Sequence, residues 1–292
     1  MKMKNILLST LFLSLFGSQI YAQSYETQML EDDPSKVLDK FIVVDILATD
    51  TDIDFQSSSV YIGGSAYWPI TDKLIIDSHV KIPYFHFGNG GFGITLEPGI
   101  YFKLFNKNKT DDVPVVIESM IYADQIEKNG VTYNVDTYKF LNAKGTYKES
   151  YGARGGLYFR QAPFTSDDFN LEDIKTGSTL AGVYIGFQKV TQAFVALLVS
   201  GNGLTNEKFI GAGFTKMFFD VMILPVSTIG DATVLAANER DGMFGFRAGF
   251  QWNKNPYDTP LAGRIVYSAE IGTRPLMGFY LSGGIGFKVF QQ

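Results

Sequence analysis

The chain has 292 residues, no cysteine and a formal net charge of −5. The absence of cysteine excludes disulfides, cysteine-ligated metals, a thiol nucleophile and a lipid-anchored cysteine. The acidic balance argues against nucleic acid as a partner, because phosphate binding needs a basic surface. Thirty glycines and a high content of phenylalanine and tyrosine are typical of strands, turns and interfacial aromatic girdles.

Residues 1–22 are typical of a secretory signal peptide. Lys2 and Lys4 form the positive start, residues 6–16 form the apolar stretch, and Ala22 is a small residue at the expected cleavage point. The apolar stretch is too short to span a bilayer comfortably. Removing the two lysines leaves 23 basic against 30 acidic residues, so we expect a mature chain with a net charge of −7.

The mature chain is expected to be a single domain. Residues 23–36 are polar and predict a short periplasmic N-terminal arm, and residues 37–292 contain no linker or composition break that would divide them. No mature segment has enough uninterrupted apolar residues for a transmembrane helix. We therefore expect an all-β protein.

Alternation with a period of two predicts the strands, and the segment 244–252 shows it most clearly. Phe246 and Trp252 fall on one face there, and Arg247 and Gln251 fall on the other. The same pattern predicts strands at 37–48, 57–68, 73–83, 91–105, 113–127, 146–161, 178–189, 192–201, 207–225, 241–253, 262–274 and 277–290.

Two strand counts are compatible with this pattern. A further strand at 131–140, joined to the preceding one through the Asn129-Gly130 turn, gives 14 strands if 207–225 is split into two. Leaving out the strand at 131–140 and keeping 207–225 as one strand gives 12. We favour 14, because it makes Lys189-Val190-Thr191 a short periplasmic turn and 162–177 a long extracellular loop. The segment 214–217 lacks turn residues and argues for 12.

The alternation, the export signal and the last strand, 278–290, together resemble the outer-membrane β-barrel proteins of Gram-negative bacteria. This resemblance implies a closed antiparallel transmembrane β-barrel in the cell outer membrane, in contact with outer-membrane lipid. It also implies insertion by the barrel-assembly machinery, which recognises the terminal strand in that class. The alternative is a soluble secreted all-β protein, whose apolar faces would pack against a second sheet.

The barrel hypothesis assigns each face of the strands. Residues expected to face lipid or a membrane partner are Phe219, Val221, Ile223, Phe244, Phe246, Phe250, Trp252, Phe279, Leu281, Ile285 and Phe287. Residues expected to line the lumen, where they could set selectivity, are Asp77, His79, Lys81, Glu97, Lys103, Glu118, Asp124, Arg154, Arg160, Lys216, Asp220, Arg247, Arg264, Glu270 and Arg274.

The charged lumen admits two functions. One is porin-like passive passage of small polar solutes through a water-filled channel. The other is a non-enzymatic accessory or structural subunit of an outer-membrane protein complex, with the lumen plugged by its own side chains. An enzyme is not expected: His79 and His86 are the only histidines, and the segment 84–90 has Gly88 where a nucleophile would be needed. No metal or cofactor is expected, and Asp50, Asp52 and Asp54 are interpreted as a solvated acidic loop.

Overall fold

A computed structural model describes residues 25–37, 40–52, 57–87, 93–128, 131–165, 175–201, 204–230, 242–256 and 264–291. The expected signal peptide and Asp54 lie outside these ranges. Twelve strands and one short 3-10 helix form this part of the chain. Their bounds are β1 Glu26–Asp32, η1 Pro34–Lys36, β2 Phe41–Asp52, β3 Ser57–Pro69, β4 Leu74–Phe87, β5 Ile94–Glu97, β6 Gly99–Lys128, β7 Val131–Thr165, β8 Lys175–Gly201, β9 Leu204–Ile229, β10 Phe244–Pro256, β11 Ile265–Arg274 and β12 Gly278–Gln291.

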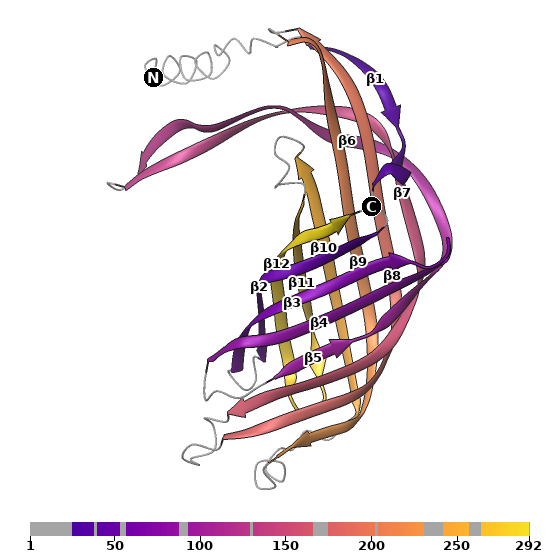
Figure 1. The fold of residues 1–292 in the computed structure, drawn as a ribbon, viewed down its shortest axis with the longest axis vertical. Helices are drawn as coiled ribbons and strands as arrows, with labels where there is room; N and C mark the ends of the chain where they lie inside the picture. The colour runs from indigo at the N-terminus through magenta and orange to yellow at the C-terminus, as the bar shows by residue number, and fades with distance from the viewer. Residues whose placement is uncertain are drawn as a thin grey trace, which may run out of the picture.

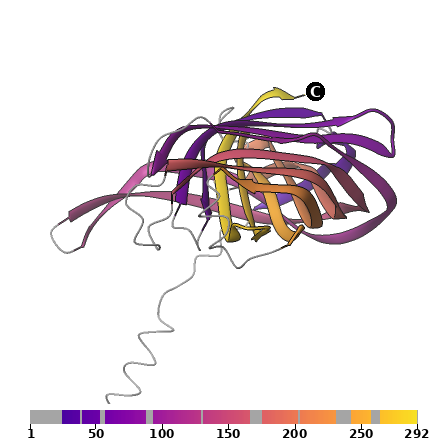
Figure 2. The same ribbon diagram turned by 90° about the horizontal axis from the view of Figure 1, so that it is seen from below.

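The strands close into an antiparallel barrel. Ten strands form the ring in the order β2, β3, β4, β5, β7, β8, β9, β10, β11, β12, and β12 pairs with β2 to close it. Figure 2 shows the barrel flattened, with the N-terminal strands in one wall and the C-terminal strands in the other. The predicted all-β closed antiparallel barrel is confirmed. The predicted 14 strands are wrong, and the alternative of 12 matches the total but not the ring.

The two strands beyond the ring of ten are β1 and β6. Strand β6 continues β5 past Pro98 in the same register, pairing with β4 at Leu74–Ile76 and with β7 from Gly156 onward. The break at Pro98 is bridged by hydrogen bonds: the Gly99 N–H donates to Ser78 Oγ at 3.2 Å, and the Leu157 N–H donates to the Pro98 carbonyl at 2.9 Å. The wall is therefore continuous at this point.

The count of 14 failed because four strands are much longer than expected. Strand β8 runs through Lys189-Val190-Thr191 without a turn and pairs there with β9. Strand β7 joins the segments predicted at 131–140 and 146–161, and β9 is one strand through Phe214. Val190 and Thr191 are β-branched and favour extended backbone, and no Gly, Pro or Asn interrupts them. The predicted hairpin between 113–127 and 131–140 is confirmed, since Lys128 pairs with Val131.

The long strands β6, β7, β8 and β9 continue beyond the ring at one end of the barrel (Figure 1). Together with β1, these continuing parts form what we call the extension. Strand β7 pairs with β8 as far as Ala193, and β1 takes its place beside β8 from Val195 to Ser200. Beyond the last pairing of β7 with β8, the β6–β7 hairpin packs over β8 and β9. Buried valines such as Val113 and Val195 share a hydrophobic cluster there. A Cβ on Gly211 of β9 would lie 2.9 Å from the Pro114 carbonyl, so this close approach requires glycine.

The segment predicted as a polar arm thus contains strand β1. Asp32 anchors it to the hairpin, accepting hydrogen bonds from the Thr146 N–H at 2.8 Å and the Thr146 hydroxyl at 2.7 Å. Asp33 then caps η1: the hydroxyl and the N–H of Ser35 both donate to its carboxylate and lower its pKa.

The outer wall of the ring is apolar. Every ring strand exposes at least one large apolar side chain, and we refer to these residues as the apolar belt. Examples, one for each ring strand, are Val44, Ile62, Ile82, Leu96, Leu157, Ile185, Phe219, Phe246, Ile271 and Leu281. The opposite faces of the same strands carry the charged residues described next.

Candidate functional site

The interior of the barrel holds a buried network of ion pairs, and Arg247 is at its centre. Its Nε donates to Asp220 Oδ2 at 2.8 Å and its Nη1 to Glu97 Oε2 at 2.5 Å, with Glu270 Oε2 at 3.7 Å from Nη1. Arg247 is 0 % exposed. Asp220 faces it directly from the neighbouring strand β9, and Glu97 lies on β5 in the opposite wall. One guanidinium therefore links the two walls.

A second group links the ends of the ring. Arg274 donates from Nη1 to Asp50 Oδ1 at 2.8 Å and from Nη2 to Asp50 Oδ2 at 2.6 Å, and Nη1 also reaches Asp52 Oδ1 at 2.8 Å. Arg160 donates to Asp52 Oδ2 at 2.8 Å. The interpretation of Asp50 and Asp52 as a solvated loop is wrong: both lie in β2, at 2 % and 1 % exposed. Two arginines from other strands neutralise them there.

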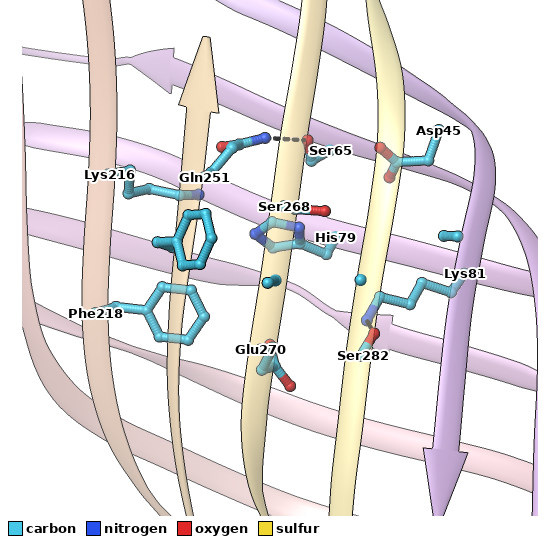
Figure 3. Close-up of a pocket in the computed structure, with 14 residues that line it drawn as sticks. Asp45, Ser65, His79, Lys81, Lys216, Phe218, Gln251, Ser268, Glu270 and Ser282 are labelled. Atoms are coloured by element: carbon cyan, nitrogen blue, oxygen red, sulfur yellow. Dashed lines mark hydrogen bonds between the residues drawn. The ribbon is translucent and has the colours of Figure 1, made fainter. Parts of the chain in front are cut away.

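A third group surrounds a small internal cavity of about 50 Å³ (Figure 3). Lys216 donates to Asp77 Oδ1 at 2.8 Å, His79 Nε2 lies 3.3 Å from the same oxygen, and Lys81 donates to Ser282 Oγ at 3.2 Å. Gln251 donates to Ser65 on the opposite wall at 3.4 Å. Charged and polar side chains line the cavity together with Phe218 and Phe250, and it is large enough for ordered water but not for a solute of several heavy atoms.

Aromatic side chains occupy the space between the ion pairs. The Arg154 guanidinium lies 4.1 Å from the centre of the Phe218 ring and 5.2 Å from that of Tyr184, with Asp220 Oδ1 at 3.4 Å from its Nε. Arg274 stacks on Tyr280 at 3.5 Å. Such contacts partly offset the loss of hydration of a buried guanidinium.

Apolar clusters close both ends of the charged region. Toward the extension, Phe41 stacks on Tyr67, and Phe214 packs edge-on against both, with ring centres 5.1–5.8 Å apart. At the other end, Leu276 and Met277 of the β11–β12 turn fold inward against Met222 and other buried side chains. Leu276 adopts φ 63°, and the Met277 N–H donates to the Pro275 carbonyl at 2.7 Å. The described side chains thus fill the interior in three layers: apolar, charged and apolar.

Most residues predicted to line the lumen are brought together inside. Asp77, Glu97, Arg154, Arg160, Lys216, Asp220, Arg247 and Arg274 are buried, and His79, Lys81, Lys103 and Glu270 are partly buried.

Three predicted lumen residues lie elsewhere, which corrects their assignment. Glu118 and Asp124 are in the part of β6 that pairs only with β7 among the described strands, beyond the ring. Arg264 is exposed just before β11 begins. Alternation indicates a face but not where a strand begins or where it leaves the barrel, which is why Arg264 in the first case and Glu118 and Asp124 in the second were misplaced.

The residues expected to face lipid or a membrane partner lie on the outer face of the barrel wall, as the alternation predicts. Phe219, Val221, Phe244, Phe246, Phe250, Trp252, Phe279, Leu281 and Ile285 are exposed. Ile223 and Phe287 are partly buried on the same faces.

Sequence reasoning missed Lys288, whose Nζ donates to Asn253 Oδ1 at 3.1 Å and lies 5.1 Å from the centre of the Phe41 ring. The signal was present, because Lys288 alternates with the outward Phe287 and Val289. Among the described residues, no group of three His, Asp or Glu side chains could hold a metal ion.

Comparison of the chain with protein-family models, with curated proteins and with solved structures gives no match. Within the described ranges, no helix is long and apolar enough to span a bilayer.

Proposed function

We propose that the chain is an outer-membrane β-barrel whose apolar belt contacts lipid. The belt surrounds the whole ring, and a protein in water would not expose so continuous an apolar surface. The closed ring has an even number of strands and leaves no open edge in the wall, as a bilayer requires. The expected export signal agrees with this location.

The proposed orientation follows from the ends of the ring. Phe41 at the start of β2 pairs with Gln291 at the end of β12, so both ends lie on the same side as the extension. In bacterial barrels both termini are periplasmic. The extension would then project into the periplasm, and the 162–177 and 226–241 segments would connect strands on the extracellular side.

We further propose that this barrel does not conduct, and that it serves as a structural or accessory subunit among outer-membrane proteins. The observation that carries this proposal is the fully buried Arg247, bonded to carboxylates of both walls and sealed between apolar layers. A ring of ten strands is close in size to eight-stranded barrels, whose interiors are filled by side chains. The periplasmic extension offers a surface for other outer-membrane proteins.

Porin-like passage of small polar solutes is the second candidate, favoured by the charged character of the interior. Single-channel recording of the purified protein in a planar bilayer distinguishes the two. We expect no reproducible conductance steps. Steps whose ion selectivity changes on Arg247→Gln or Glu97→Gln substitution would instead establish a channel.

Location is tested separately by membrane fractionation. We expect the mature protein to resist carbonate extraction and to migrate differently on gels with and without boiling, as closed membrane barrels do. A monodisperse mature protein that needs no detergent would overturn the membrane proposal and support a soluble barrel.

A further inference from the structure

The apolar belt has two adjoining hollows on the outer wall, beside the break at Pro98. One, of about 870 Å³, is lined by Ile76, Ile100, Phe102, Ala153 and Leu157, among others. The second, of about 480 Å³, is lined by Ile42, Ala66, Val80 and Leu96, among others. Ser78 and Pro98 line both, so the hollows are neighbours.

Their shape follows from the local sequence. Small residues such as Gly64, Ala66, Ala153 and Gly155 stand on the outward faces of β3 and β7, whereas most of the belt carries Phe, Ile, Leu or Val. Larger side chains, such as Ile100 and Leu157, form the sides of the hollows. The Gly99 N–H, freed by the break, is already bonded to Ser78, so the backbone presents no unmet donor at this point.

Two lysines lie at the rim of the hollows. Lys40, two residues before Ile42, lies over the Trp68 ring at 5.6 Å from its centre, and Trp68 is two residues from Ala66. Lys73 is exposed beside the other hollow, where its carbonyl accepts from the Lys103 N–H at 2.8 Å. Each lysine follows an aspartate in the sequence, Asp39 before Lys40 and Asp72 before Lys73.

We propose that this site binds one diacyl anionic phospholipid, with one acyl chain in each hollow and the phosphate at Lys40 and Lys73. Two adjoining apolar hollows match two hydrocarbon chains, and the two lysines at their rim match a single anionic head group. This inference rests on the proposed membrane location, since the hollows must face lipid. It identifies a specific lipid partner for one face of the barrel.

Native mass spectrometry of the full mature protein in detergent tests the proposal. The probes are phosphatidylglycerol, which is anionic, and phosphatidylcholine, which is zwitterionic. We expect one phosphatidylglycerol to remain bound at detergent concentrations that strip phosphatidylcholine. The double variant Ala66→Leu/Ala153→Leu fills the hollows from outward positions and should lose this lipid. Ala248→Leu, on the outward face of β10, is the control that should keep it.

The lysines give an independent test that leaves the hollows unchanged. Lys40→Gln and Lys73→Gln should each weaken phosphatidylglycerol binding by about fivefold, and phosphatidylcholine binding much less. Lys208→Gln in the extension is the matched control. Equal retention by wild type, the hollow-filling variant and both lysine variants would overturn the inference. A heat-modifiable barrel that binds no lipid selectively overturns this inference alone, whereas a protein that is soluble without detergent overturns the membrane proposal.

Discussion

Arg274 and Asp50 form a bidentate ion pair between residues 224 positions apart, with N–O distances of 2.8 and 2.6 Å. Arg274 lies on β11 and Asp50 on β2, so the guanidinium passes over Tyr280 of β12 to reach its partner. Strands β12 and β2 are where the two ends of the ring meet. The pair therefore connects the seam of the barrel from inside, in addition to the backbone hydrogen bonds between the two strands.

Removing one partner of this pair should destabilise the closed barrel strongly. Arg274→Ala leaves Asp50 and Asp52 buried without their main counter-charge, and breaking a buried pair in this way costs about 3–5 kcal/mol. The measurement is urea unfolding of the refolded protein in lipid vesicles. Lys109→Ala, which removes an exposed pair with Asp111, is the control and should have little effect. Equal midpoints for the two variants would show that the seam pair does not hold the ring.

Phe246 tests whether the outer face of β10 contacts lipid, because its side chain is 50 % exposed there. Phe246→Arg should cost about 2–4 kcal/mol in a bilayer if the residue lies near mid-depth, because lipid cannot solvate the guanidinium. Gln28→Arg, at an exposed position of β1 in the extension, should be tolerated. Folding into vesicles, followed by the gel shift on boiling, gives the comparison. A tolerated Phe246→Arg would remove β10 from the lipid-facing wall.

The sequence alone predicts which residues of a strand face inward and which face outward. It does not predict how far a strand extends or which strands it pairs with. Alternation around Arg247 correctly separates buried Arg247 and Gln251 from exposed Phe246 and Trp252. It carries no information about which neighbour a strand has, so the departure of the β6–β7 hairpin from the ring, and with it the position of Glu118, was not predictable. Asp50 was missed because aspartate is rare in strands, and only its distant partner Arg274 makes burial acceptable.

Ser78 should matter through its hydroxyl alone. Ser78→Ala leaves the Gly99 N–H without its acceptor on the wall, and an unmet buried donor costs about 1–3 kcal/mol. Ser78→Thr keeps the hydroxyl and should restore most of the stability. Thermal unfolding in detergent, followed by circular dichroism, measures both. If alanine and threonine behave alike, the break at Pro98 is held by the Leu157 hydrogen bond and not by Ser78.

Strand β1 should be released by a single substitution outside the barrel. Asp32→Ala removes both hydrogen bonds to Thr146, and β1 then keeps its edge pairing with β8 and the Glu31–Lys36 ion pair. Hydrogen exchange of the Val195–Ser200 amides should become faster, because these lie beside β1, while exchange at 180–188 of the same strand stays slow within the ring. Asp32→Asn keeps an acceptor and should have a smaller effect. Faster exchange along the whole of β8 would mean instead that the extension and the barrel unfold together, so that β1 supports the ring and does not merely cover its edge.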